Sequence, residues 1–153
     1  MKPRGFTYFE LLATMAVMMI LATAILPTAK VVRKRQKEIE LRRSLRILRT
    51  ALDGYHDAVR QGRIGGTDVQ VGSEGYPKDL DVLVKGVSQV GKIDSKLKFL
   101  RSVPYDPMTG KAEWGKRCYQ DDPDDTSWCG ENVWDVHSLS EGKALDGTKY
   151  KEW

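Results

Sequence analysis

The feature that most constrains this chain is an apolar run over residues 6–26, in which Glu10 is the only charged side chain. As a helix these 21 residues span about 32 Å, which is long enough to cross a bilayer. A carboxylate in the middle of a bilayer costs roughly 2.5 kcal/mol or more, so it needs a partner. The run contains no cation, and we therefore expect the partner of Glu10 to belong to another molecule.

The residues before Glu10 form a motif in fixed order. Lys2-Pro3-Arg4-Gly5 is a short basic leader, and Phe6-Thr7-Tyr8-Phe9-Glu10 opens the apolar run. This motif resembles the class III signal of type IV pilins and type II secretion pseudopilins. The resemblance implies that a prepilin peptidase cuts between Gly5 and Phe6 and N-methylates Phe6, which makes Glu10 the fifth residue of the mature chain. The Tyr8-Phe9 pair departs from the usual aliphatic pair and keeps the site apolar.

Two other interpretations of the N-terminus compete with this one. A secretory signal has a shorter apolar region, about 7–15 residues, and is cut after that region rather than before it. An ordinary single-pass anchor explains the apolar run but not the combination of Gly5-Phe6 with Glu10. The order of the motif therefore favours the pilin-like interpretation.

A second helical stretch is expected over residues 30–61. Apolar residues recur there at spacings of three and four and define one stripe of a helix: Leu41, Leu45, Leu48, Leu52, Tyr55 and Val59. Glycines at 62, 65 and 66 end the pattern. Pro27 predicts a kink or local break between the two helical stretches, or it marks the exit from the membrane. In the resembled family a proline at this depth lies where filament packing stretches the helix.

The remaining residues predict a small, strand-containing head. Residues 62–75 form a glycine-rich connector, residues 76–84 a short helix started by a proline, and residues 97–110 a turn. Residues 112–119 and 132–138 alternate well enough for two antiparallel strands, and residues 148–153 are a candidate third strand. Large aromatics on the strands of a small domain are usually core, which places Trp114, Trp128 and Trp134 inside.

Three short stretches of this head are similar to the major pseudopilin of type II secretion: Tyr76-Pro77, residues 100–107, and residues 135–142. The resemblance implies an α+β chain with the type IV pilin fold, in which a long N-terminal helix packs on a small antiparallel head. The expected division is a leader (1–5), a transmembrane or filament-core helix (6–29), an amphipathic stalk helix (30–61) and a periplasmic head (62–153).

The start of the second helix is strongly basic, with Lys30, Arg33, Lys34, Arg35, Lys37, Arg42, Arg43, Arg46 and Arg49. These residues could face acidic surfaces of neighbouring subunits, anionic lipid headgroups or nucleic acid. The positive-inside rule would place them in the cytoplasm, which conflicts with the topology that the resemblance implies. We follow the resemblance, because the leader must face a cytoplasmic peptidase and paired cysteines fit an oxidising compartment.

The two cysteines, Cys118 and Cys129, are expected to form a disulfide in that compartment, worth about 3 kcal/mol for a loop of this length. Four aspartates lie between them, at positions 121, 122, 124 and 125. A solvated acidic loop that docks on a neighbour's basic helix is favoured there over a calcium site. Members of the resembled family bind calcium in the loop that corresponds to the one after residues 135–138 here. Leu139, Ser140, Glu141 and Asp146 are the weak candidates here, so no cofactor is assigned.

No catalytic set of residues emerges, and an enzyme is not expected. The predicted function is a structural subunit, the major pseudopilin, of a type II secretion pseudopilus whose growth drives folded proteins across the outer membrane. Gly5 and Phe6 would serve processing, and Glu10, Phe6 and Pro27 assembly. The resemblance implies an inner-membrane chain with a periplasmic head, with copies of itself, minor pseudopilins, an assembly platform and the peptidase as partners, and without nucleic acid. A type IV or competence pilin, and a membrane-anchored periplasmic binding module that never polymerises, remain the alternatives.

Overall fold

The computed structural model describes residues 5–65, 69, 72–92, 95–122, 125 and 127–153, with the side chains of 24–28 outside the description. The chain divides into two compact units, Met1–Gln36 and Lys37–Trp153. Each unit is described by itself below. The architecture is α+β, with one long helix and two small antiparallel sheets.

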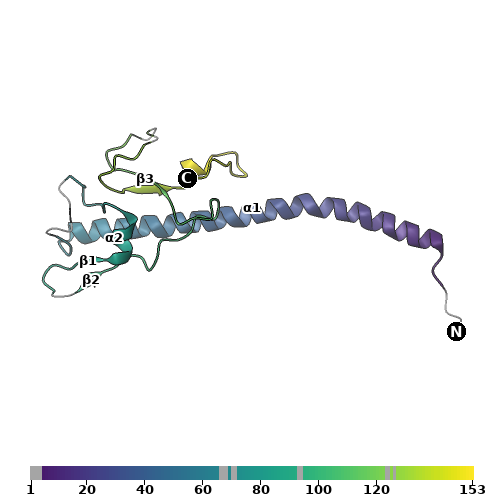
Figure 1. Cartoon of the computed structure of the whole chain (residues 1–153), viewed down its shortest axis with the longest axis horizontal. Coiled ribbons are helices and arrows are strands. Elements are labelled where there is room, and N and C mark those ends of the chain that lie inside the picture. Colours follow the sequence, from purple (N-terminus) through teal and green to yellow (C-terminus); the bar gives the residue numbers. More distant parts are fainter. Residues whose placement is uncertain (1–4, 66–68, 70–71, 93–94, 123–124, 126) are drawn as a thin grey trace. The chain divides into compact units, whose positions relative to one another are not determined.

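Helix α1 (Tyr8–Arg60) is a continuous helix of 53 residues (Figure 1). Thr7 caps its start, because the Thr7 hydroxyl accepts a hydrogen bond from the Glu10 amide at 3.3 Å. The helix ends at Arg60, and the turn that follows contains Gly62, whose φ of +66° suits a glycine and whose amide donates to the Val59 carbonyl at 2.9 Å. The two helical stretches predicted over residues 6–29 and 30–61 are parts of this one helix.

The local break predicted at Pro27 is wrong, because α1 continues through that position. A proline removes one backbone donor from a helix, and a long helix can lose one bond while the turns on either side keep theirs. The side chain of Pro27 lies outside the described residues. Within the described part of the chain, no helix combines the length and the apolar character that crossing a membrane requires.

The core of unit Lys37–Trp153 is built on the predicted stripe of α1. Leu41, Leu48 and Leu52 are fully buried there, while Val59 is partly buried. Helix α2 (Leu80–Lys85) adds Leu80 and Leu83 to this core, and the Asp79 carboxylate caps its first turn at 2.6 Å. The predicted stripe and short helix are therefore confirmed, although α2 begins after an aspartate cap and not at Pro77.

Two short hairpins complete this unit. Strands β3 (Gly115–Arg117) and β4 (Asp135–His137) pair antiparallel as predicted, with Lys116 opposite Val136. Strands β1 (Val87–Ser88) and β2 (Lys96–Leu97) form a second antiparallel pair, which the sequence analysis missed. Two residues per strand are too few to produce a recognisable alternation. Figure 1 shows α2, β1, β2 and β3 beside the C-terminal part of α1.

The third strand predicted over residues 148–153 is wrong, because η2 (Tyr150–Glu152) is a 3-10 helix. Tyr150 and Trp153 lie three residues apart, and a 3-10 turn places such residues on one face. Their ring centroids are 5.3 Å apart, and the Tyr150 hydroxyl donates to Glu38 of α1 at 3.0 Å. A strand would have sent the two rings to opposite faces.

The turn over residues 104–110 is fixed from inside by Asp106, which is fully buried. The Asp106 carboxylate accepts hydrogen bonds from the Ser138 hydroxyl at 2.6 Å and from the Met108 amide at 2.8 Å. Two of the stretches that carry the resemblance thus meet at this pair, which holds the turn against the end of β4.

Candidate functional site

The predicted processing site lies just outside α1. Gly5 and Phe6 precede the helix and are exposed, with 79% of Phe6 accessible. Glu10 lies in the first turn of α1, where the positive end of the helix dipole favours a carboxylate. Thr7 and Glu10 are also three residues apart, which is the spacing of a capping box and is visible in the sequence.

The first part of α1 exposes apolar side chains on every side. Five consecutive residues are more than half exposed: Val17 (56%), Met18 (72%), Met19 (66%), Ile20 (69%) and Leu21 (60%). Because successive residues are 100° apart on a helix, five in a row cover its whole circumference. We call residues 6–23 the apolar segment. A soluble monomer rarely exposes a continuous apolar surface of this kind, which usually marks contact with protein or lipid.

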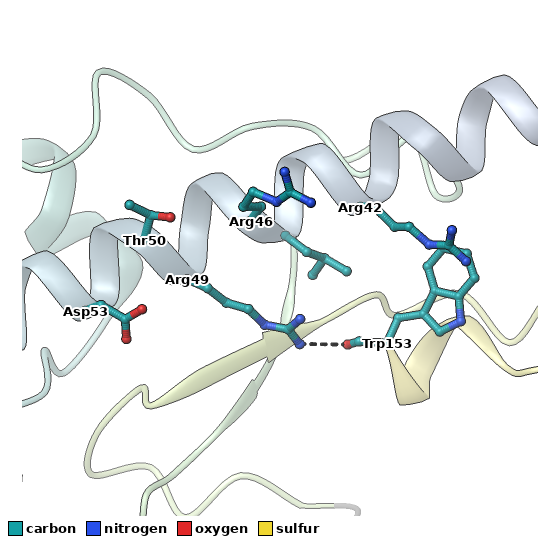
Figure 2. A pocket seen from close by; sticks show the side chains of 7 residues that line it. Arg42, Arg46, Arg49, Thr50, Asp53 and Trp153 are labelled. Atoms are coloured by element: carbon teal, nitrogen blue, oxygen red, sulfur yellow. Dashed lines mark hydrogen bonds between the residues drawn. The ribbon is translucent and has the colours of Figure 1, made fainter.

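A groove of about 570 Å³ lies along α1 in unit Lys37–Trp153. Its lining residues are Arg42, Leu45, Arg46, Arg49, Thr50, Asp53 and Trp153. Figure 2 shows the Arg42 guanidinium over the Trp153 indole, 4.3 Å from the ring centroid. The groove thus combines positive charge with an aromatic wall.

Arg49 connects α1 to the rest of the head at one end of this groove. Its guanidinium donates to both oxygens of Asp135, at 2.6 and 3.1 Å. It also donates to the Trp153 carbonyl at 2.9 Å, the bond drawn in Figure 2. A bidentate arginine–carboxylate pair fixes orientation as well as charge. Arg49 is therefore occupied within the chain and has a structural role.

On the outer side of α1, two arginines lack the contacts inside the described chain that Arg49 makes. Ile39, Arg42, Arg43, Arg46 and Ile47 line a second shallow groove. Arg42 contacts Trp153 and Asp146 of the head, so we call the other four residues the basic face. Arg43 and Arg46 form no ion pair or hydrogen bond with any residue that the structure describes. Ile39 is 59% exposed and Ile47 is 43% exposed. This face offers charge and apolar surface without an internal partner.

The predicted disulfide joins Cys118 to Cys129, with the two Cα atoms 5.9 Å apart. The prediction that three tryptophans of the head are core is wrong for two of them. Trp114 is buried, whereas Trp128 is 36% exposed and Trp134 is 43% exposed. Trp134 instead packs edge-on against exposed Tyr119 at 6.2 Å. The few strand residues cannot cover both faces of the sheet, so aromatics that do not face α1 remain at the surface.

The weak calcium candidates have other contacts. Asp146 accepts hydrogen bonds from the Thr148 hydroxyl at 2.6 Å and from its amide at 3.0 Å, and lies 3.7 Å from Arg42. The Thr148 hydrogen bonds lower the pKa of the Asp146 carboxyl. The Ser140 hydroxyl accepts from the Gly142 amide, and Leu139 and Glu141 are exposed. Within the described residues, the one close group of acidic or cysteine ligand atoms is Cys118, Asp121 and Cys129, where the thiols are already joined.

Strands β3 and β4 each contain a polar side chain with a buried nitrogen. The Nδ1 of His137 and the Nε of Arg117 are buried without a hydrogen-bond partner among the described residues. Burial, and then the charge of Arg117, lower the pKa of His137 below its usual 6.5. Gly115 lies directly opposite His137, and a side chain at Gly115 would collide with the imidazole. Neither nucleophile nor metal-ligand geometry accompanies this pair in the described part of the head.

Comparison of the chain with protein-family models, curated proteins and solved structures gave no match.

Proposed function

We propose that this chain is a structural subunit of a helical filament of the type IV pilin class, as a pseudopilin of type II secretion. The observation that carries the proposal is the apolar segment, exposed on every side with Glu10 as its sole charge. In a filament the apolar segments of many copies would cover one another in the core. The type IV pilin fold and the rank of major subunit rest on the resemblance and belong to this proposal.

The same proposal includes the processing and location of the chain. Prepilin peptidase would cut between Gly5 and Phe6, an exposed pair outside α1, and would methylate Phe6. The apolar segment would hold the new subunit in the bacterial inner membrane with the head in the periplasm, until an assembly platform and minor pseudopilins draw it into the filament. Assembly would then push folded cargo toward an outer-membrane channel.

Glu10 gives the filament its register in this proposal. Its carboxylate would pair with the amine of Phe6 on an adjacent copy. Removal of one partner from a pair buried in an apolar core leaves an uncompensated charge, which costs about 3–5 kcal/mol. Assembly should therefore depend on the charge of Glu10.

The test uses the full chain in membranes and compares Glu10→Ala with Glu10→Gln. A glutamine keeps the capping-box geometry but has no charge. We expect both variants to lose the ladder of cross-linked multimers, and the mature protein to begin at methylated Phe6 by mass spectrometry. If Glu10→Gln assembles normally, Glu10 serves only as a helix cap; if both variants assemble, the filament proposal fails.

A further inference from the structure

The basic face of α1 points away from the head of its own chain. At 100° per residue, Ile39, Arg43 and Arg46 lie roughly opposite the stripe of Leu41, Leu48 and Leu52 that packs into the core. Arg43 and Arg46 have no partner within the described chain, and Ile39 and Ile47 flank them in an exposed groove. Four exposed residues of this composition are suited to contact an acidic surface that also has apolar atoms.

Four described residues in and just after the disulfide loop provide such a surface, and we call them the loop patch: Tyr119, Asp122, Glu131 and Trp134. Tyr119 and Trp134 are exposed aromatics in edge contact, and the carboxylates of Asp122 and Glu131 are exposed. Neither carboxylate has a partner among the residues that the structure describes. Arginine pairs with carboxylates and also stacks on aromatic rings, so one surface satisfies both kinds of contact.

The chain already uses this kind of contact internally. Arg42 lies over the Trp153 ring at 4.3 Å, and Lys116 lies over the Trp128 ring at 4.4 Å. Both pairs are inside the head, whereas Arg43, Arg46, Tyr119 and Trp134 have comparable chemistry and no such cation–aromatic contact within the described residues. The two unpaired surfaces are complementary in charge and in aromatic and aliphatic character.

We propose that the loop patch of one copy, Tyr119, Asp122, Glu131 and Trp134, docks on the basic face of α1 of a second copy. The two patches belong to different parts of the same unit, so the contact is heterologous: each copy offers its loop to one neighbour and its basic face to another. Heterologous contacts that do not close into a ring produce open helical assemblies. This inference rests on the proposed filament and names the contact between heads that accompanies packing of the apolar segments.

The experiment reverses charge on each surface of the full chain in membranes and measures the yield of cross-linked multimers. Arg43→Glu with Arg46→Glu changes the basic face, and Asp122→Arg with Glu131→Arg changes the loop. We expect each pair to lower the multimer yield at least tenfold, and the chain with all four substitutions to recover most of it, because the charges are then complementary again. Lys98→Glu with Arg101→Glu, on exposed residues elsewhere in the head, is the matched control and should retain the wild-type yield.

The outcomes separate this inference from the proposed function. If wild type forms multimers that depend on Glu10 while both charge reversals assemble normally, the docking contact is wrong and the filament remains. If only the helix reversal reduces assembly and the four-substitution chain does not recover, the basic face binds an anionic lipid surface or nucleic acid, which overturns the docking contact. If wild type forms no multimers, the filament proposal itself fails. Thermal unfolding of each variant confirms that the head is folded.

Discussion

Two stretches of α1 differ in how far their apolar side chains are buried. In the apolar segment, Met18 is 72% exposed and its neighbours on every side of α1 are apolar. In the later stretch, Leu48 is fully buried in the core, while Arg46 and Ile47 beside it are at the surface. The spacing makes the difference, because apolar residues at every third or fourth position form one stripe that a single head can cover. An unbroken apolar run needs partners all around it.

The two stretches differ in whether their apolar side chains have partners inside the described chain. The stripe from Leu41 to Tyr55 finds its partners in α2 and the hairpins, and it is complete within one unit. The apolar segment has none of these contacts within its own unit. Substitutions in the two stretches should therefore affect different properties.

The largest expected effect comes from Leu48→Ala, with Met18→Ala as its counterpart. Deleting buried methyl groups leaves a cavity, so Leu48→Ala should lower the unfolding free energy of the head by about 2–5 kcal/mol. Met18→Ala should change it by less than about 0.5 kcal/mol, because Met18 is exposed. Denaturant unfolding of the full chain in detergent measures both, and equal losses would contradict the contrast between the two stretches.

Reduction of the disulfide is expected to act on the head alone. Opening the loop between Cys118 and Cys129 should lower the unfolding free energy of the head by about 3 kcal/mol in the chain-entropy model. The helical signal of the apolar segment should not change. Cys118→Ser with Cys129→Ser is the control, since reductant should have no further effect on it; a reductant response in that variant would refute the assignment.

A smaller effect distinguishes two arginines of α1. Arg49→Ala removes four hydrogen bonds to the head and should cost about 1–2 kcal/mol, because the pair with Asp135 is partly exposed. Arg46→Ala, three residues earlier on the outer side, should leave stability within about 0.5 kcal/mol. The measurement is the denaturant midpoint of each variant at constant slope. Loss of stability in Arg46→Ala would mean that the basic face has an internal role.

The smallest effect is a pH dependence of the head from His137. Its pKa is lowered in the folded state from 6.5, so the unfolded chain binds the proton first as the pH falls. The unfolding free energy should therefore decrease as the pH falls through 6.5 toward the folded pKa, and level off below it. His137→Gln should flatten this part of the profile while the rest of the acid response stays. A profile that is unchanged in His137→Gln would assign the slope to other groups.

Much of the fold could be predicted from the sequence because its signals are local or periodic. The stripe of α1, the glycine at its end, the β3–β4 hairpin and the disulfide each depend on a short pattern. The β1–β2 hairpin and η2 could not be predicted, since two or three residues carry no periodicity. The exposure of Trp134 could not be predicted either, because it depends on how many strand residues are available to cover the ring. Thr7 was missed although its spacing to Glu10 was visible.

The sequence alone determined where apolar surface occurs, where charge is concentrated and that Glu10 is alone in its run. Only the tertiary structure decided which charges are already used. Arg49 and Arg46 are alike in the sequence, but Arg49 is held by Asp135 and Trp153, whereas Arg46 faces outward without a partner in the described chain. The reason is physical: residues three apart on a helix differ by about 60°, which moves the side chain from the edge of the buried stripe at Arg49 to the outer side at Arg46. Contacts with distant segments of the chain then hold the arginine at the edge of the stripe and leave the outer one exposed.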